Sequence, residues 1–378
     1  MIGSARRPGA WRRWAAVLAG VGVLVALPPA VARLPAAESS ISASQLLARI
    51  RASGTVAHDG YAESTARLSL PDVRQAGDAL RLLGERTALR VWWAGPLTWR
   101  VDDVSPVGER DTYRDPDGTW LWESLDRRAT RVDGEPQVRL VRAPDLAPIE
   151  LGRRLTASAR PDEVLRLPAR RVAGRSVPGI RVTPRDPETT VGRVDVWADE
   201  RTGVPVLVSV TARGAAEPLL ETLYLDLHIR PQPAARFTFV PPRRARVEQT
   251  AASDAAQEVD RYSPFVVPET LDDRPRRTAV GTGAGTYGDG YAVVAVLTLP
   301  AGRVQRAMDR LDGPLTPTIT GLFGDGKLLA TPLINGLLVI RDDVGYVLAG
   351  TVNRAVLERV ATDLVSRPPV SRHSEPVP

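Results

Sequence analysis

Apolar and polar residues alternate along short stretches through most of residues 42–242, which is the pattern of antiparallel strands. Turn signals such as Gly95-Pro96 and the run 199–203 separate the stretches. Two stretches, 42–52 and 145–157, have helical spacing instead. The pattern predicts an α+β first domain with about ten strands and two helices. We expect one large, strongly curved antiparallel sheet with the helices on its concave side.

The tightest predicted hairpin, residues 91–101, contains three of the chain's 8 tryptophans: Trp92, Trp93 and Trp99. It turns at Gly95-Pro96. Neighbouring side chains on a strand point to opposite faces, so one of Trp92 and Trp93 faces the concave side and the other faces outward. The sequence leaves both registers open.

The tryptophans are the candidate ligand-binding residues. Large aromatic side chains bury much surface, so packing in a wide curved sheet explains any one of them. The alternative is that they line an apolar cavity between the sheet and its helices. The candidates for that cavity are Trp92, Trp93, Trp99, Trp120 and Trp122.

A second, smaller α+β domain is predicted over residues 262–366. It contains a buried strand at 291–299 and an amphipathic helix at 353–364. The polar segment before it, 243–261, is rich in Ala, Gln and Glu and is predicted to be a linker. The Pro-rich end, 367–378, is expected to be disordered.

Residues 1–32 have the pattern of an export signal. A basic start precedes an uninterrupted apolar run of about 14 residues and the small-x-small sequence Ala30-Val31-Ala32. The alternative is an uncleaved anchor, because about 19 apolar residues are just enough to span a bilayer. Both interpretations place the rest of the chain in the cell envelope, at the outer face of the cytoplasmic membrane or in a periplasm-like space.

The charge distribution argues against nucleic-acid binding. The formal net charge is +6, but four of the 50 basic residues lie in the first 32 positions, which contain none of the 44 acidic residues. The remainder is therefore close to neutral and has no global basic footprint. A membrane surface is the more natural neighbour of an exported chain.

Motifs for catalysis, metals or cofactors are incomplete. Cys is 0, and the three histidines, His58, His228 and His373, are isolated from one another. Residues 283–288 match Gly-x-Gly-x-x-Gly, but a strand follows them where a dinucleotide site needs a helix, so a flexible loop is expected. Asp102 and Asp103 are adjacent on a strand and face opposite sides. We expect no catalytic residue, no metal and no cofactor.

Two parts of the sequence resemble known envelope proteins. The turn at 199–203 and the Phe-x-Phe-x-Pro-Pro run at 237–242 resemble the LolA-like superfamily. Residues 344–361 are similar to the closing strand and helix of the RseB/MucB-type periplasmic regulators of anti-sigma factors, whose two-domain order also matches. The resemblance covers about residues 42–366. It implies a half-open β-barrel with helices over an apolar cavity, and no catalytic residue.

The resemblance also implies what the chain binds. The ligand would be an acyl chain, a lipid or a lipoprotein, and the partner a membrane-anchored anti-sigma factor. Two functions therefore remain open: a regulator that senses the ligand, and a carrier that moves lipid or lipoprotein without signalling. A secreted enzyme is a third possibility, against which the lack of a nucleophile–base pair in the sequence counts.

Overall fold

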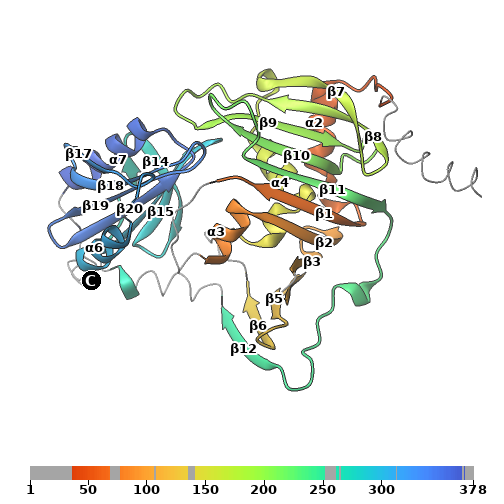
Figure 1. Ribbon diagram of the computed structural model, residues 1–378, viewed down its shortest axis with the longest axis horizontal. Coiled ribbons are helices and arrows are strands. Elements are labelled where there is room, and N and C mark those ends of the chain that lie inside the picture. Colours follow the sequence, from red (N-terminus) through yellow and green to blue (C-terminus); the bar gives the residue numbers. More distant parts are fainter. Residues whose placement is uncertain are drawn as a thin grey trace, which may run out of the picture.

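The computed structural model describes residues 36–68, 77–105, 108–134, 141–251, 261–263, 265–311, 313–367 and 370 (Figure 1). The predicted export signal and residues 371–378 of the predicted disordered end lie outside this part of the chain. Within it, no helix is both long enough and apolar enough to cross a bilayer. The fold is α+β, as the sequence predicted, with two large and mostly antiparallel sheets.

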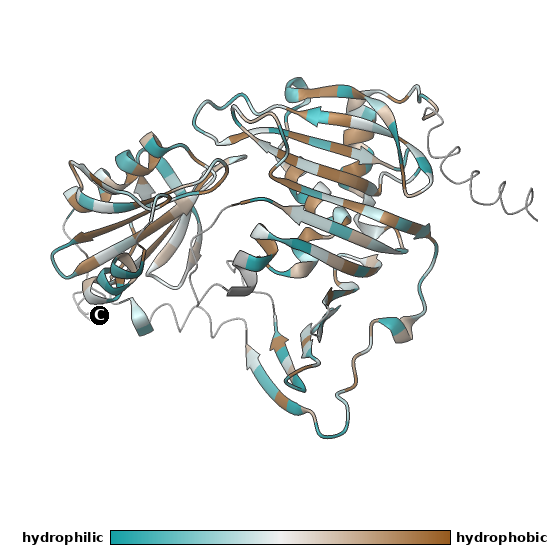
Figure 2. Ribbon diagram, viewed as in Figure 1, coloured by the Kyte–Doolittle hydropathy of each residue, from teal (hydrophilic) through white to brown (hydrophobic). Residues whose placement is uncertain are grey.

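The first sheet has 12 strands in the order β12-β6-β5-β4-β3-β2-β1-β11-β10-β9-β8-β7. β12 and β6 pair in parallel, and the other neighbours pair antiparallel. The strands are β1 His58–Ala66, β2 Arg86–Gly95, β3 Thr98–Ser105, β4 Gly108–Asp115, β5 Gly118–Glu123, β6 Arg128–Asp133, β7 Val164–Val172, β8 Arg175–Val182, β9 Val191–Ala198, β10 Pro205–Ala212, β11 Leu220–Ile229 and β12 Arg246–Ala251. Figure 2 shows apolar and polar residues alternating along its central strands.

Two helices cover one face of this sheet, α2 (Ala43–Ala52) and α4 (Pro148–Ala157) (Figure 1). Ser42 caps α2 in a capping box with Gln45, which satisfies backbone donors that a helix start leaves unpaired. The buried side of α2 carries Leu46, Leu47 and Ile50. A third helix, α3 (Gly77–Gly84), lies near one end of β1 and β2.

The two edge strands of the first sheet are absent from the sequence prediction. β12 occupies part of the predicted linker 243–261, of which residues 252–260 lie outside the described part of the chain. β7 contains Pro168 and several arginines, a composition that is typical of sheet edges because an edge strand pairs on one side only. Both strands are largely exposed, so the apolar alternation that identifies a strand is weak in them.

The second sheet has 8 strands in the order β13-β14-β15-β16-β20-β19-β18-β17. α7 (Arg354–Ser366) buries Val356, Leu357, Val360, Ala361 and Leu364 in the same core as this sheet. The other elements are β13 Thr270–Leu271, β14 Arg274–Val280, β15 Ala284–Asp289, β16 Ala292–Pro300, α6 Ala301–Arg310, β17 Thr318–Gly321, β18 Gly324–Ala330, β19 Asn335–Arg341 and β20 Val344–Gly350.

The Gly-x-Gly-x-x-Gly run is not the flexible loop that the sequence predicted. Most of it forms β15, between β14 and β16, and its Tyr287 is fully buried. At Gly283 a Cβ atom would lie 2.2 Å from the Ser263 Oγ atom. The glycines therefore permit close packing within a sheet.

The segment before β9 contacts the second sheet and the helix α7. Glu188 forms ion pairs with Arg274 and with Arg359, which come from β14 and α7. Thr189 forms a β-bridge with Val352, and the Thr190 hydroxyl donates to the Leu333 carbonyl oxygen at 2.5 Å. These contacts fix residues 188–190 against the second domain.

Candidate ligand-binding site

The strand register settles which face each tryptophan of the hairpin occupies. Trp93 pairs with Trp99, and Trp92 pairs with Arg100. Trp93 is 2% exposed, and its indole Nε1 donates to the Gly54 carbonyl oxygen at 2.6 Å, just after α2. The Trp93 and Trp99 rings stack with centroids 6.1 Å apart. Trp93 and Trp99 therefore lie on the face that the helices cover, and Trp92 points away from it.

The other face of the sheet carries a second aromatic cluster. Cross-strand pairing links Trp92 to Arg100, Arg100 to Tyr113, and Tyr113 to Trp120, so all four side chains share this face. Phe239 packs over the cluster, with its centroid 5.0 Å from Tyr113, 5.3 Å from Trp120 and 6.0 Å from Trp122. Arg100 lies over Trp92 and Tyr113, 4.9 Å and 4.6 Å from their centroids. The sheet thus divides the five candidate tryptophans into two groups.

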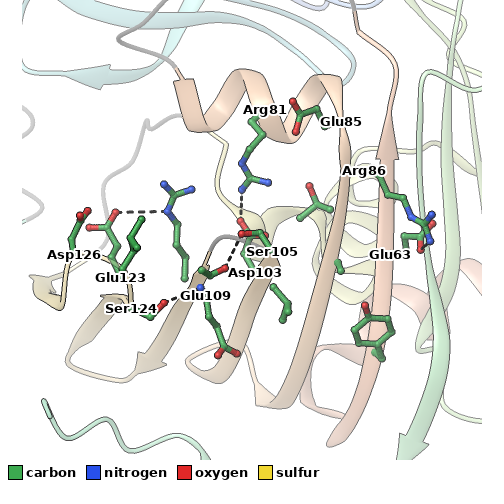
Figure 3. A pocket seen from close by; sticks show the side chains of 17 residues that line it. Glu63, Arg81, Glu85, Arg86, Asp103, Ser105, Glu109, Glu123, Ser124 and Asp126 are labelled. Carbon is green, nitrogen blue, oxygen red and sulfur yellow. Dashed lines mark hydrogen bonds and ion pairs between the residues drawn. The ribbon is translucent and has the colours of Figure 1, made fainter.

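A cavity lies beneath α3, at the ends of β1 to β5, and has a volume of about 690 Å³ (Figure 3). Its size is in the range of small-molecule sites. Nine of its 17 lining residues are charged, and none of the five tryptophans lines it. The lining residues are Tyr61, Glu63, Arg81, Glu85, Arg86, Thr87, Ala88, Asp103, Val104, Ser105, Gly108, Glu109, Arg110, Glu123, Ser124, Leu125 and Asp126.

A smaller cavity of about 130 Å³ adjoins it and shares Arg81, Asp103, Arg110 and Glu123. Its other walls include apolar residues, among them Leu82, Leu121, Trp122 and Val141. Trp122 is therefore the one candidate tryptophan that borders either cavity. The larger cavity, with many charged lining residues, therefore lies beside a smaller and more apolar cavity.

Ion pairs neutralise every arginine of the larger cavity. Arg81 of α3 reaches down to Asp103 of β3 (Figure 3). Arg86 pairs with Glu63, and Arg110 lies 3.7 Å from Glu123. The lining contains six acidic residues and three arginines, and Glu109 also pairs with Arg90 just outside it. A small acidic excess therefore remains, at Glu85 and Asp126.

Three carboxylates gather on the opposite face: Asp102, Glu109 and Asp111 have oxygens within 4.8 Å of one another. Such a set resembles a cation site, and it is the only group of this kind among the residues that the structure describes. Here the Arg100 guanidinium donates twice to Asp102 at 2.7 Å and once to Asp111 at 3.2 Å. The arginine already supplies the positive charge, which identifies the group as an ion-pair cluster.

Asp111 makes this cluster sensitive to pH. Burial, and then the neighbouring Asp102 charge, raise the pKa of Asp111 to about 7. Its folded pKa exceeds the unfolded value, so the fold loses stability as pH rises from about 4 to about 7. We therefore expect Asp111→Asn to be more stable than the native protein at pH 8, by about 1–2 kcal/mol after screening by Arg100 and solvent. Urea unfolding at about pH 3 and at pH 8, on either side of both the unfolded and the folded pKa, measures this.

The difference between Asp111→Asn and the native protein should become small at about pH 3, below the unfolded-state pKa of about 3.9, where Asp111 is mostly protonated in both the folded and the unfolded state. Asp309→Asn, at an exposed acid of α6, provides the control and should show no such pH dependence. A variant that is less stable than the native protein at pH 8 would refute the assignment.

Neither of the two histidines that the structure describes is placed for nucleophilic catalysis. His58 is fully buried, and burial lowers its pKa to about 4. Its ring nitrogens contact the Val56 carbonyl oxygen at 2.8 Å and the Tyr224 hydroxyl at 3.0 Å. His228 lies near the carboxylates of Asp59 and Asp226. No serine or threonine hydroxyl of the described chain is hydrogen-bonded to either ring.

No family model and no curated protein matches this sequence. Among solved structures, the chain is similar to MucB in complex with MucA(peri), with 17% identity over 85% of this chain and 97% of that one and a TM-score of 0.47. The Pseudomonas aeruginosa MucA/MucB complex shows 18% identity, with 85% and 97% coverage and a TM-score of 0.44. A LolA superfamily protein from Nitrosomonas europaea shows 12% identity, with 53% and 99% coverage and a TM-score of 0.25. The sequence resemblance named these same two groups.

Proposed function

We propose that this chain is a non-enzymatic protein of the cell envelope that senses an acyl chain, a lipid or a lipoprotein and modulates a membrane-anchored anti-sigma factor. The observation that carries the proposal is the cavity of about 690 Å³ between α3 and the strands of a large open sheet. A cavity of this size suits a ligand, and no nucleophile–base pair accompanies it among the described histidines. In this proposal the first domain is a half-open β-barrel of the LolA-like kind.

In the proposal, the apolar part of the ligand lies in the smaller cavity, and the other candidate tryptophans support its walls. Trp122 borders the smaller cavity beside Leu121 and Val141. Trp93 and Trp99 form part of the helix-covered wall, while Trp92 and Trp120 stiffen the outer face through Arg100 and Phe239. The driving force is burial of apolar surface, at roughly 25 cal/mol per Å².

The anti-sigma partner is inferred from the sequence resemblance of residues 344–361, which form β20 and most of α7. Arg359 on α7 is paired with Glu188 of the first domain. The helix that carries the resemblance is therefore in direct contact with the ligand-binding domain.

Native mass spectrometry of the chain purified from membranes tests the ligand. We expect a bound lipid or acylated species that is released on denaturation. Leu121→Ala, at an apolar residue that lines the smaller cavity, should weaken its retention roughly tenfold, which corresponds to about 1.4 kcal/mol. Leu322→Ala, at a residue of the second domain that is 89% exposed, is the matched control. A chain that never carries lipid, even after incubation with vesicles, would overturn the proposal.

A LolA-type carrier without a signalling role is the second candidate. It is favoured by the position of both cavities, whose lining residues all belong to the first domain. Recovery of a membrane-anchored anti-sigma factor with the tagged chain supports the regulator. Transfer of labelled lipoprotein between vesicles, with no such partner recovered, supports the carrier.

A further inference from the structure

The inner wall of the larger cavity contains buried polar side chains where a sheet facing its helices normally presents apolar ones. Ser64 pairs with Thr87 across β1 and β2, and Leu89 pairs with Asp103 across β2 and β3. Because strand side chains alternate, Ser64, Thr87 and Asp103 share the face of Leu89. They are 0%, 2% and 4% exposed, respectively.

These side chains have unused hydrogen-bonding capacity. The Ser64 Oγ, Thr87 Oγ1 and Asp103 Oδ1 atoms have no hydrogen-bond partner within the part of the chain that the structure describes. Buried polar groups are nearly always paired, so a cluster without partners marks a place for another molecule. Thr87 and Asp103 line the larger cavity directly, and Ser64 lies beside Thr87.

The charges around this cluster favour a cation. Asp103 receives Arg81 on its Oδ2 atom, which leaves Oδ1 for a second donor. The cavity lining has six acidic residues and three arginines, and the arginines are all paired with acids. Arg81 Nε also lacks a partner in the described chain, but the acidic excess opposes an anionic ligand there.

We propose that the cavity beneath α3 binds an alkylammonium group, with Asp103 as its counter-ion and the Thr87 hydroxyl as a hydrogen-bond acceptor. A primary ammonium carries three N–H donors and no acceptor, which complements oxygens that need donors. The charge-assisted bond to Asp103 supplies the strength, and Thr87 supplies selectivity for a group that has N–H donors. The inference rests on the proposed function, because it names the polar end of the ligand for the same site.

Isothermal titration calorimetry with butane-1,4-diamine tests the inference. We expect one diamine bound per chain, and at least tenfold weaker binding of the fully N-methylated quaternary analogue, which keeps the charge and loses every N–H donor. Equal binding of the two cations, or preferential binding of the neutral butane-1,4-diol, would overturn the inference.

Thr87→Val is the decisive variant. It keeps the side-chain shape and removes a hydroxyl that has no partner in the described chain, so the fold should be at least as stable as before. We expect diamine affinity to fall at least fivefold in Thr87→Val and to stay unchanged in Glu217→Gln, at an exposed acid elsewhere in the first domain. Unchanged diamine affinity in Thr87→Val would refute the assigned contact.

Vesicles distinguish the sources of the ammonium group. Selective binding to phosphatidylethanolamine vesicles over phosphatidylcholine vesicles, reversed by the diamine, identifies a lipid headgroup. Diamine binding without that selectivity identifies a free amine. If lipid is retained in native mass spectrometry but neither amine test succeeds, the inference fails and the proposed function stands. If neither lipid nor amine binds, both fail.

Discussion

Trp93→Ala is expected to destabilise the first domain by about 3–5 kcal/mol, the range found for truncating a large buried aromatic side chain. Trp93 is 2% exposed and stacks between Trp99 and His58, with centroids 6.1 Å and 6.3 Å away. Its truncation leaves a cavity in the core and removes the donor to the Gly54 carbonyl oxygen. The loss should appear as a lower urea midpoint for the first domain, followed by far-ultraviolet circular dichroism.

Trp92→Ala is the matched control, because it removes the same side chain from the next position on the opposite face. Trp92 is half-buried and contacts Arg100 and Arg236, 4.9 Å and 5.5 Å from the ring centroid. We expect this substitution to cost about 1 kcal/mol, in line with a partly exposed cation–π contact. Equal losses for the two variants would show that the strand register described above is wrong.

A longer stretch of sequence predicts which of Trp92 and Trp93 lies on the buried face. Leu89 and Val91 precede Trp93 at two-residue spacing, and both are fully buried. Arg90 precedes Trp92 and is exposed. The alternation of strand side chains therefore places Trp93 on the buried face once the whole of β2 is considered. The hairpin alone was too short to show this.

The edge strands were harder to predict for a physical reason. β12 pairs with β6, whose residues are more than one hundred positions earlier, and that contact leaves no local pattern in either segment. An edge strand has little buried surface, so its residues are free to be polar or charged. By contrast, β10 is buried at every position, so its sequence is rich in the β-branched residues that are typical of strands.

The cavity was missed because its walls come from distant segments and are not aromatic. Residues between Tyr61 and Asp126 line it, from five strands and one helix. One sequence feature does indicate the cavity. Three neighbouring strands each carry a polar residue on the face where their other residues are mostly apolar: Ser64, Thr87 and Asp103. Detecting it requires the pairing of β1, β2 and β3, which the sequence alone does not provide. The aromatic clusters, which are visible in sequence, pack on both faces of the sheet.

Gly203→Ala is expected to cost roughly 3 kcal/mol, by combining a strained backbone with a steric clash. Gly203 closes the turn between β9 and β10, where its φ is +74° and its amide donates to the Asp199 carbonyl oxygen at 2.8 Å. A Cβ atom there would lie 2.2 Å from the Arg49 carbonyl oxygen in α2. The backbones of the β9–β10 turn and of α2 are both held by hydrogen bonds, so the clash is relieved only if the turn moves away from the helix. Thermal unfolding of the variant measures the loss.

Gly174→Ala separates the two contributions, because Gly174 has nearly the same backbone conformation without the clash. Its φ is +72°, and nothing lies within 4 Å of a Cβ atom at that position. We expect it to cost about 1–2 kcal/mol, the strain of a left-handed conformation alone. The excess at Gly203 then measures how tightly the β9–β10 turn packs against α2. Equal losses would mean that α2 is held by its other contacts, including the buried face of Leu46, Leu47 and Ile50, and that the turn is free to move.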